Sequence, residues 1–303
     1  MPSPHPHLPF LAWPAQWREH GLRGDLVAGI TVALVLIPQA LAYAKLAGLP
    51  PHIGLYAALL PAVVAALFGS CGQLSTGPVA LTSLLVGASI LPLGATAGGD
   101  LVGLALLLAL LSGLIQLALG VLRLGWLLNL LSVPVLMGFV NAAALIICLT
   151  QIPPLLGLAM PHSDHLLVDF VRALGGLDAL QPAAAAFGVG SLAVLVGLKR
   201  LWPRLPGVPL VVAATIALSA WTGFAAQGGA VVGAVPAGLP GFSLPPLRPE
   251  LIAALLPAAF VVAMVSFMEA ASSAKLICGR TRQPWNQDQE LVGQGLGKLA
   301  AAF

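Results

Sequence analysis

The apolar pattern of the chain breaks at Thr76-Gly77-Pro78, where a membrane helix is not expected to break. An apolar run over 53–69 and a short polar turn precede this tripeptide, and a second apolar run, 79–91, follows it. The second run has 13 residues, so as a helix it rises about 20 Å, whereas the hydrocarbon core of a bilayer is about 30 Å thick. We therefore predict a half-helix over 78–91 that starts near mid-bilayer, with Pro78 in its first turn, where a missing N–H is harmless.

A helix N-terminus inside a membrane presents unpaired N–H donors and the positive end of the helix dipole. Many secondary transporters hold anions at broken helices of this kind. The Thr76-Gly77-Pro78 turn therefore indicates an anion carrier. A re-entrant kink without a ligand is the alternative, because irregular backbone at this depth must line protein or water in any case.

Composition supports the membrane assignment. Of the 303 residues, 59% are hydrophobic and 8% are charged, and the mean hydropathy is +0.99. A soluble domain carries about 25% charged residues. We therefore expect an all-α polytopic membrane protein embedded in a lipid bilayer, and a soluble enzyme is excluded. The net charge of +3 comes without a dense basic cluster, so no nucleic-acid partner is predicted.

The three cysteines, Cys71, Cys148 and Cys278, lie far apart and have no metal-binding spacing. Free cysteines of this kind usually serve as small apolar packing residues. We predict no metal site, no cofactor and no catalytic residue.

The apolar runs predict a series of helices whose bounds follow the hydrophobic stretches. These are 25–46, 53–69, the half-helix 78–91, 101–122, 127–149, 183–201, 209–225, 251–276 and a last helix that begins near residue 286. Basic residues then gather on one side of the membrane: Arg18, Arg23, Arg123, Lys199, Arg200, Arg204, Lys275, Arg280 and Arg282. The opposite side has Lys45, Arg172 and Arg248 against Asp100, Asp164, Asp169, Asp178 and Glu250. The positive-inside rule therefore predicts a cytoplasmic N-terminus.

Glu269 lies inside the predicted helix 251–276, and it is the one ionisable residue that we place deep in a span. A charge there costs several kcal/mol, so an intramembrane acid is a functional residue by default. The expected role is coupling to a proton or another cation. A structural carboxylic acid bound to a neighbouring helix is the alternative.

Pro38, Gln39 and Tyr43 lie within the first predicted helix. Pro38 removes one backbone hydrogen bond, and Gln39 and Tyr43 are four residues apart on one face. An amide and a phenol on one face suit a cavity for a small oxyanion, and a polar contact between helices is an equally good interpretation. Ala44-Lys45-Leu46 also recurs at 274–276, which is a weak sign of an inverted repeat.

Together these residues resemble the SulP family of inorganic anion transporters. The similarity runs through Ile37–Ala44, Leu46–Pro51, Gly54-Leu55-Tyr56, Pro61, Phe68-Gly69-Ser70 and Thr76–Ala80, and it continues at Asn286–Leu291 with Gly293 and Gly295. The resemblance implies a seven-plus-seven inverted repeat with a core and a gate domain. It also implies an anion site lined by Gln39 and Tyr43, with backbone N–H groups from Val79 and Ala80, and Glu269 as the acid of helix eight.

The same resemblance divides the chain into four parts. We expect a cytoplasmic N-terminal segment over 1–24, a first transmembrane repeat over 25–225, an extracytoplasmic loop over 226–250 and the start of a second repeat over 251–303. Half-helix ten, helices eleven to fourteen and the STAS domain of the family are absent, so we expect an incomplete carrier. Lys298 also stands where the family commonly has Asn.

We predict secondary active transport of a small inorganic anion, sulfate first, across the inner (plasma) membrane, by symport with a proton in preference to sodium. Bicarbonate, chloride and dicarboxylates stay open as substrates. The family resemblance also implies a homodimer. Two other functions are kept as alternatives: a nucleobase permease of similar fold, and a non-transporting remnant or scaffold.

Overall fold

The computed structural model is helical, with no strand in the residues that it describes. Those residues are 9–13, 21–94, 96, 98–126, 133–158, 166–176, 180–202, 205–227, 229, 231–233, 235, 236, 238 and 241–303. Arg18, Asp164, Asp178 and Arg204, which entered the charge argument, lie outside them.

The chain divides into two compact units. Unit 1 comprises Met1–Ser132 and Pro236–Phe303, and unit 2 comprises Val133–Val235. This division groups helices from both ends of the sequence, whereas the predicted repeats follow the sequence order. The repeat boundaries at 25–225 and 251–303 therefore stay a prediction about internal symmetry.

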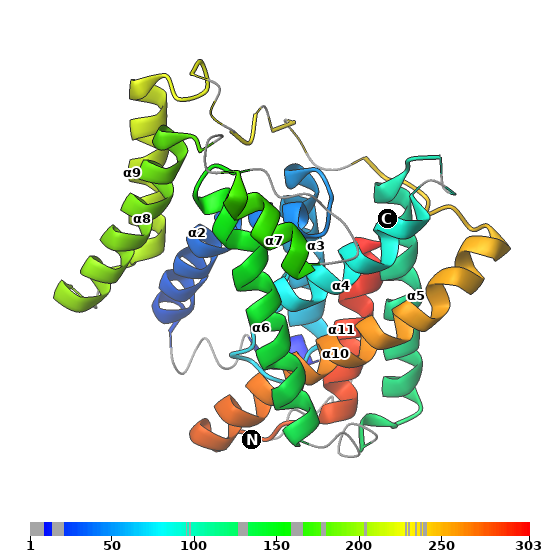
Figure 1. Ribbon diagram of the computed structural model, residues 1–303. Helices are drawn as coiled ribbons and strands as arrows, with labels where there is room; N and C mark the ends of the chain where they lie inside the picture. The colour runs from blue at the N-terminus through cyan, green and yellow to red at the C-terminus, as the bar shows by residue number, and fades with distance from the viewer. Residues whose placement is uncertain are drawn as a thin grey trace. The chain divides into compact units, whose positions relative to one another are not determined.

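Unit 1 contains η1 (Pro9–Ala12), α2 (Arg23–Leu46), α3 (Pro51–Phe68), α4 (Ala80–Ile90), η2 (Leu91–Leu93), α5 (Leu101–Val121), α10 (Pro249–Thr281) and α11 (Gln287–Ala301) (Figure 1). Most predicted bounds are within two residues of these. The largest difference is at the C-terminal end of α10, which continues five residues beyond the predicted end at Leu276. The added residues include Arg280 and Thr281, whose polarity ended the apolar run although helical hydrogen bonding continues.

Unit 2 contains α6 (Val133–Leu155), α7 (Leu166–Gly175), α8 (Pro182–Leu201) and α9 (Gly207–Thr222) (Figure 1). The predicted helix 127–149 begins in residues outside the described part, and α6 continues through Pro153 and Pro154 to Leu155. Helix α7 was not predicted. It is only ten residues long and amphipathic, with Asp169 and Arg172 among its apolar residues, so it gives no apolar run to detect.

Within the described part of the chain, five helices are long and apolar enough to cross a membrane: α2, α3, α5, α8 and α10. The helix that begins at Ala80 is among the shorter apolar ones. At 11 residues, α4 rises about 16 Å, which is well under the thickness of the hydrocarbon core. The predicted half-helix is therefore confirmed as a short element separated from α3.

Glycines let α11 pack closely against two helices at once. A Cβ on Gly295 would lie 2.7 Å from the backbone nitrogen of Leu117 on α5. A Cβ on Gly293 would lie 2.7 Å from the nitrogen of Gly69, and one on Gly297 would lie 3.0 Å from the carbonyl oxygen of Pro61. Small residues at such contacts allow the two backbones to approach closely. The van der Waals packing that results is a main source of attraction between helices in lipid. Helix α11, red in Figure 1, therefore joins α3 to α5.

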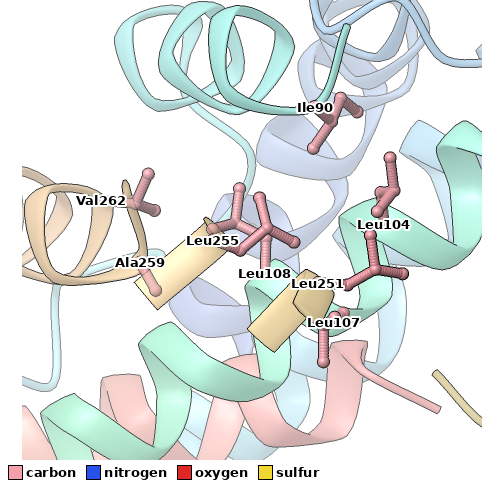
Figure 2. Close-up of a cluster of buried hydrophobic side chains, with 8 residues drawn as sticks. All are labelled: Ile90, Leu104, Leu107, Leu108, Leu251, Leu255, Ala259 and Val262. Carbon is pink, nitrogen blue, oxygen red and sulfur yellow. The ribbon is translucent and has the colours of Figure 1, made fainter. Parts of the chain in front are cut away.

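An apolar cluster joins α4, α5 and α10, as Figure 2 shows. It consists of Ile90, Leu104, Leu107, Leu108, Leu251, Leu255, Ala259 and Val262. Buried side chains of this size each contribute about 1.5–3 kcal/mol in a water-based reference; in lipid the corresponding gain comes from close packing. The cluster sets the end of the half-helix against the first turns of α5 and α10.

The contacts also give the relative directions of the helices. Leu251 and Leu255 of α10 pack in the cluster with Leu104 near the start of α5, and further along Gln116 of α5 bonds to Ala263 of α10. Helices α5 and α10 therefore run in parallel. Helix α11 runs opposite to α5, because Gly120 meets Val292 whereas Gly113 meets Leu299. These directions agree with the alternation that the predicted spans require.

Candidate functional site

Helix α4 begins beside the middle of α2. A Cβ on Gly77 would lie 3.2 Å from Leu36 Cδ1, and a Cβ on Gly87 would lie 3.1 Å from Ala47 Cα. The two helices therefore run side by side in the same direction. Leu36 is 13 residues from the start of α2 at Arg23, or about 20 Å along its axis. The start of α4 thus lies well inside the span of α2.

The half-helix starts two residues later than predicted. Val79 is its N-cap, with an extended backbone (φ −127°, ψ 144°), and no side chain caps this end. Pro78 therefore belongs to the extended segment before the helix and not to the first turn, which corrects the prediction. The first helical bond at this end runs from the Ser83 N–H to the Val79 carbonyl (2.9 Å). The N–H groups before Ser83 have no acceptor within the helix.

Gln39 and Tyr43 lie on the face of α2 that meets this segment. Leu36, Gln39 and Tyr43 are spaced i, i+3 and i+7, so they follow one stripe of the helix, and Leu36 is the residue in contact with Gly77. Gln39 is exposed and Tyr43 is half-buried. Val79 is 39% exposed, and Ala80 is half-buried. The stripe of α2 that bears Gln39 and Tyr43 therefore meets the segment before α4 at Leu36.

A buried carboxylate on α11 holds the turn that leads to the half-helix. Glu290 is 2% exposed, and its Oε2 accepts hydrogen bonds from the backbone N–H groups of Ser70 (2.9 Å) and Cys71 (3.1 Å). Its Oε1 accepts from Gln294 Nε2 at 3.2 Å, and the same Gln294 nitrogen donates to Thr76 Oγ1 at 2.8 Å. The segment from Ser70 to Thr76 is thus tied to one face of α11.

Neighbouring residues of α11 make further contacts of this kind. The Asn286 side chain caps α11 by accepting from the N–H groups of Asp288 and Gln289. Asp288 Oδ1 accepts from the Gly125 N–H (2.9 Å), and Gln289 Nε2 donates to the Phe68 carbonyl. From the sequence, these residues served only as a point of family resemblance. Many of their side chains can form hydrogen bonds to backbone groups, and they lie next to Gly293 and Gly295. That combination was the signal that could have indicated an anchoring role.

Glu269 lies on α10 and is half-buried. Its Oε2 is buried and has no hydrogen-bond partner among the described residues. Lys298 of α11 is close enough to Glu269 for the two charges to interact. The sequence singles out Glu269 as the one ionisable residue deep in a span, and the structure adds Lys298 of α11 as a charged neighbour. Lys298 was named only as a departure from the family pattern, because the last helix had no predicted end against which its depth could be judged.

Two cavities lined by described residues of unit 2 lie away from these side chains. The larger of the two best-defined ones, about 380 Å³, is in unit 2 and is lined by residues such as Gln181, Phe224 and Gln227. None of the predicted site residues lines it, and the described lining residues carry no charge. It therefore does not bear on the anion site. The described residues contain no group of three or more metal-ligating side chains.

Comparisons with known proteins give one family. A model described as the sulfate permease family matches residues 22–303. The chain is 36% identical over 302 residues to sulfate transporter 4.1, chloroplastic, of Arabidopsis thaliana, covering 95% of this chain and 43% of that protein. It is 37% identical over 291 residues to a probable sulfate transporter of Mycobacterium tuberculosis, covering 95% and 51%. It is 32% identical over 335 residues to the sodium-independent sulfate anion transporter of Bos taurus, covering 98% and 54%. The chain thus spans about half the length of the curated relatives it matches.

Solved structures agree with the fold. The transmembrane domain of a cyanobacterial bicarbonate transporter, BicA, is 26% identical with a TM-score of 0.81, and the match covers 93% of this chain and 72% of that one. The murine Slc26a9 anion transporter in its inward-facing state has a TM-score of 0.90 at 24% identity, covering 98% and 53%. The expected class, an all-α polytopic membrane protein of the seven-plus-seven transporter type, is confirmed.

Proposed function

Because this chain belongs to the sulfate permease family, whose model matches residues 22–303, we propose that it carries half of an anion-binding site of a secondary transporter. The substrate is a small inorganic anion, with sulfate first, in line with the names of its relatives in Arabidopsis thaliana, Mycobacterium tuberculosis and Bos taurus. The family consists of membrane permeases and not of enzymes.

The observation that carries the proposal is the position of the α4 N-terminus. Its free N–H groups and the positive end of its dipole lie inside the span of α2, next to the stripe that bears Gln39 and Tyr43. An anion there gains backbone hydrogen bonds and a favourable dipole. An amide and a phenol supply further donors from the facing helix. Thr76, Gly77, Pro78, Val79 and Ala80 form the wall from which the backbone donors project.

Glu269 is the proposed coupling residue. A carboxylate with an unpartnered buried oxygen needs a proton or a cation to be stable inside a membrane. We assign the proton to this role, which makes the carrier a symporter. The name of the Bos taurus relative, which describes a sodium-independent transporter, supports the choice of a proton over sodium.

We further propose that the N-terminus lies in the cytoplasm and that the protein resides in the inner (plasma) membrane. Unit 1 and unit 2 are proposed to correspond to the core and the gate of the carrier.

Because the chain spans about half the length of its relatives, the complete site requires a second half-helix with the opposite orientation. The homodimer that the family resemblance implies stays a prediction.

The proposal is tested by uptake of labelled sulfate into liposomes that contain the full-length protein. Gln39→Ala removes one donor to the anion. A hydrogen bond to a charged group contributes about 1.5–3 kcal/mol, so KM is expected to rise roughly tenfold or more. The matched control is Gln283→Ala, because Gln283 is exposed at the end of α10 and is not expected to change KM.

Two results would contradict the proposal. One is saturable sulfate uptake with the same KM in the wild-type protein and in Gln39→Ala. The other is the absence of any anion uptake by a folded full-length protein. Bicarbonate is the second candidate substrate, since the 26%-identical solved structure is titled a bicarbonate transporter. Bicarbonate is added as a competitor to labelled sulfate in the same vesicles, and the extent to which it lowers sulfate uptake decides between the two substrates.

A further inference from the structure

A polar cluster lies where α5, α10 and α11 meet. It consists of Gln116, Ser266, Glu269 and Lys298, and is called the three-helix polar cluster below. Gln116 Nε2 donates to the Ala263 carbonyl (2.7 Å) and to Ser266 Oγ (3.0 Å). Lys298 Nζ donates to Ser266 Oγ (2.5 Å) and reaches the Val262 carbonyl at 3.5 Å. Ser266 and Glu269 are three residues apart on α10, so they share one face of that helix.

Two oxygen atoms of this cluster are buried without a partner in the described part of the chain. They are Gln116 Oε1, on a side chain that is 0% exposed, and Glu269 Oε2. Buried polar atoms are nearly always hydrogen-bonded, and exceptions call for an explanation. Oxygen acceptors of this kind, one of them from a carboxylate, are ligands that a hard cation such as sodium prefers. The ammonium group of Lys298 is bound to Ser266 of the same cluster, and its charge interacts with that of Glu269.

The pair formed by Glu269 and Lys298 is electrostatically isolated along its own helices. Helix α5 contains no charged residue, and neither does α4. On α10 the nearest other charge is Lys275, six residues from Glu269. On α11 the nearest is Glu290, eight residues from Lys298, which is about 12 Å along the axis. The interaction between these two charges therefore dominates the field at Glu269.

The base of the Lys298 side chain is fixed by the packing of α11 on α5. A Cβ on Gly113 would lie 3.0 Å from Lys298 Cβ, so the lysine emerges where the two helices are in close contact. Its aliphatic stem then passes to Ser266 on α10. The position of the ammonium group is thus set by the backbone packing and by two acceptors, Ser266 Oγ and the Val262 carbonyl.

We propose that Lys298 is a tethered cation that takes the place of a sodium ion at Glu269 and so makes the carrier independent of sodium. The inference rests on the proposed function and deepens it by naming the residue that selects the coupling ion. With Lys298 charged, the pair is neutral, and a sodium ion would add an uncompensated positive charge in a medium of low dielectric constant. A proton adds the same single charge, but it forms a covalent bond to an oxygen of Glu269 and requires no further ligands, so proton coupling remains open to the pair.

The experiment measures sodium binding without relying on transport. The apparent melting temperature of the purified full-length protein is recorded in sodium chloride and in choline chloride at equal ionic strength. Wild-type protein and Lys298→Arg, which keeps the charge, are expected to melt at the same temperature in both salts. Lys298→Met keeps an apolar stem without the charge. Its melting temperature is expected to rise with sodium concentration until it saturates, because a ligand that binds only the folded state stabilises that state.

The double variant Lys298→Met with Glu269→Gln is expected to lose this stabilisation, because the carboxylate that attracts sodium is gone. Labelled-sulfate uptake provides the second measurement. Sodium is expected to leave wild-type uptake unchanged and to stimulate uptake by Lys298→Met by about fivefold or more, the lower end of ordinary coupling between sites. Lys298→Gln, which can still donate to Ser266, repeats the comparison if the methionine variant does not fold.

A sodium-dependent melting temperature in the wild-type protein overturns the inference. So does a folded Lys298→Met or Lys298→Gln that sodium does not stabilise. Failure of the proposed function has a different signature: no variant would take up sulfate, while the melting temperatures would still show whether Lys298 excludes sodium.

Discussion

At the scale of single residues, Glu290 shows how a charge can be a structural part of a membrane protein. Its carboxylate accepts two backbone N–H groups, from Ser70 and Cys71, and a side-chain bond from Gln294. Buried charges are stable when they are fully hydrogen-bonded. Glu269 is the opposite case, since one of its oxygens is buried without a partner in the described residues. The first acid holds a turn in place, and the second is available for an ion.

We expect Glu290→Leu to destabilise the protein by about 1.5–3 kcal/mol or more, because two buried N–H groups lose a charged acceptor. Glu290→Gln keeps an acceptor oxygen and is expected to cost less. Thermal unfolding of the purified protein in detergent measures both. The control is Glu250→Gln, at an exposed acid in the first turn of α10, which is expected to change the stability by less than about 1 kcal/mol. Equal stability of Glu290→Leu and the wild-type protein would show that the turn is held by other contacts.

At the scale of elements, the glycines of α11 determine how closely its neighbours pack. Gly293 and Gly297 face α3, and Gly295 faces α5. This alternation places the polar residues of the same helix, Glu290 and Gln294, where they reach the segment before α4. The position of the half-helix therefore depends on the backbone packing of α11 as much as on its own sequence.

Gly295→Ala is expected to destabilise the protein by about 1–3 kcal/mol, the usual cost of overpacking. The new Cβ would lie 2.7 Å from Leu117 N and 3.0 Å from the Gly113 carbonyl oxygen, and backbone atoms cannot move aside as a flexible side chain can. Gly279→Ala on α10 is the same substitution in open space, with no atom within 4 Å. It is expected to be neutral or to stabilise by up to about 1 kcal/mol, since alanine is the better helix former. Melting temperatures that fall equally for both variants would contradict the packing argument.

At the scale of the whole molecule, the order of the helices and their relative directions describe a polytopic chain. Helices α5 and α10 run in parallel, α11 runs opposite to both of its neighbours α3 and α5, and α2 runs with α4. Basic residues lie at helix ends that the predicted alternation places on one side, for example Arg280 in the last turn of α10. The positive-inside rule predicts that this side is the cytoplasmic one.

The orientation is tested with single cysteines in a protein whose three native cysteines have been replaced. Arg200→Cys is expected to react with a membrane-impermeant thiol reagent only after the membrane is opened. Leu244→Cys, in the connection before α10, is expected to react in intact cells. Both positions are exposed, so the comparison depends on the side of the membrane and not on burial. The reverse pattern of labelling would invert the topology.

The amino-acid sequence alone was enough for the class of protein, for most helix bounds and for the half-helix. These features depend on local hydrophobicity and on the conformational limits of glycine and proline, which act over a few neighbouring residues. Gln39, Tyr43 and Glu269 could be chosen for the same reason, since a polar side chain in an apolar helix stands out in any fold. Their roles stay predictions, although Leu36, on the same stripe of α2, contacts Gly77 just before α4.

Only the tertiary structure decided which distant residues meet. Glu290 lies 220 residues from Ser70, and the thiols of Cys71 and Cys278, interpreted as separate packing residues, lie 3.3 Å apart across 207 positions. Lys298 reaches Ser266, one turn before Glu269, because glycines bring α11 against α5. Such contacts depend on how whole helices pack, and packing in lipid is set by the fit of surfaces that no local pattern describes.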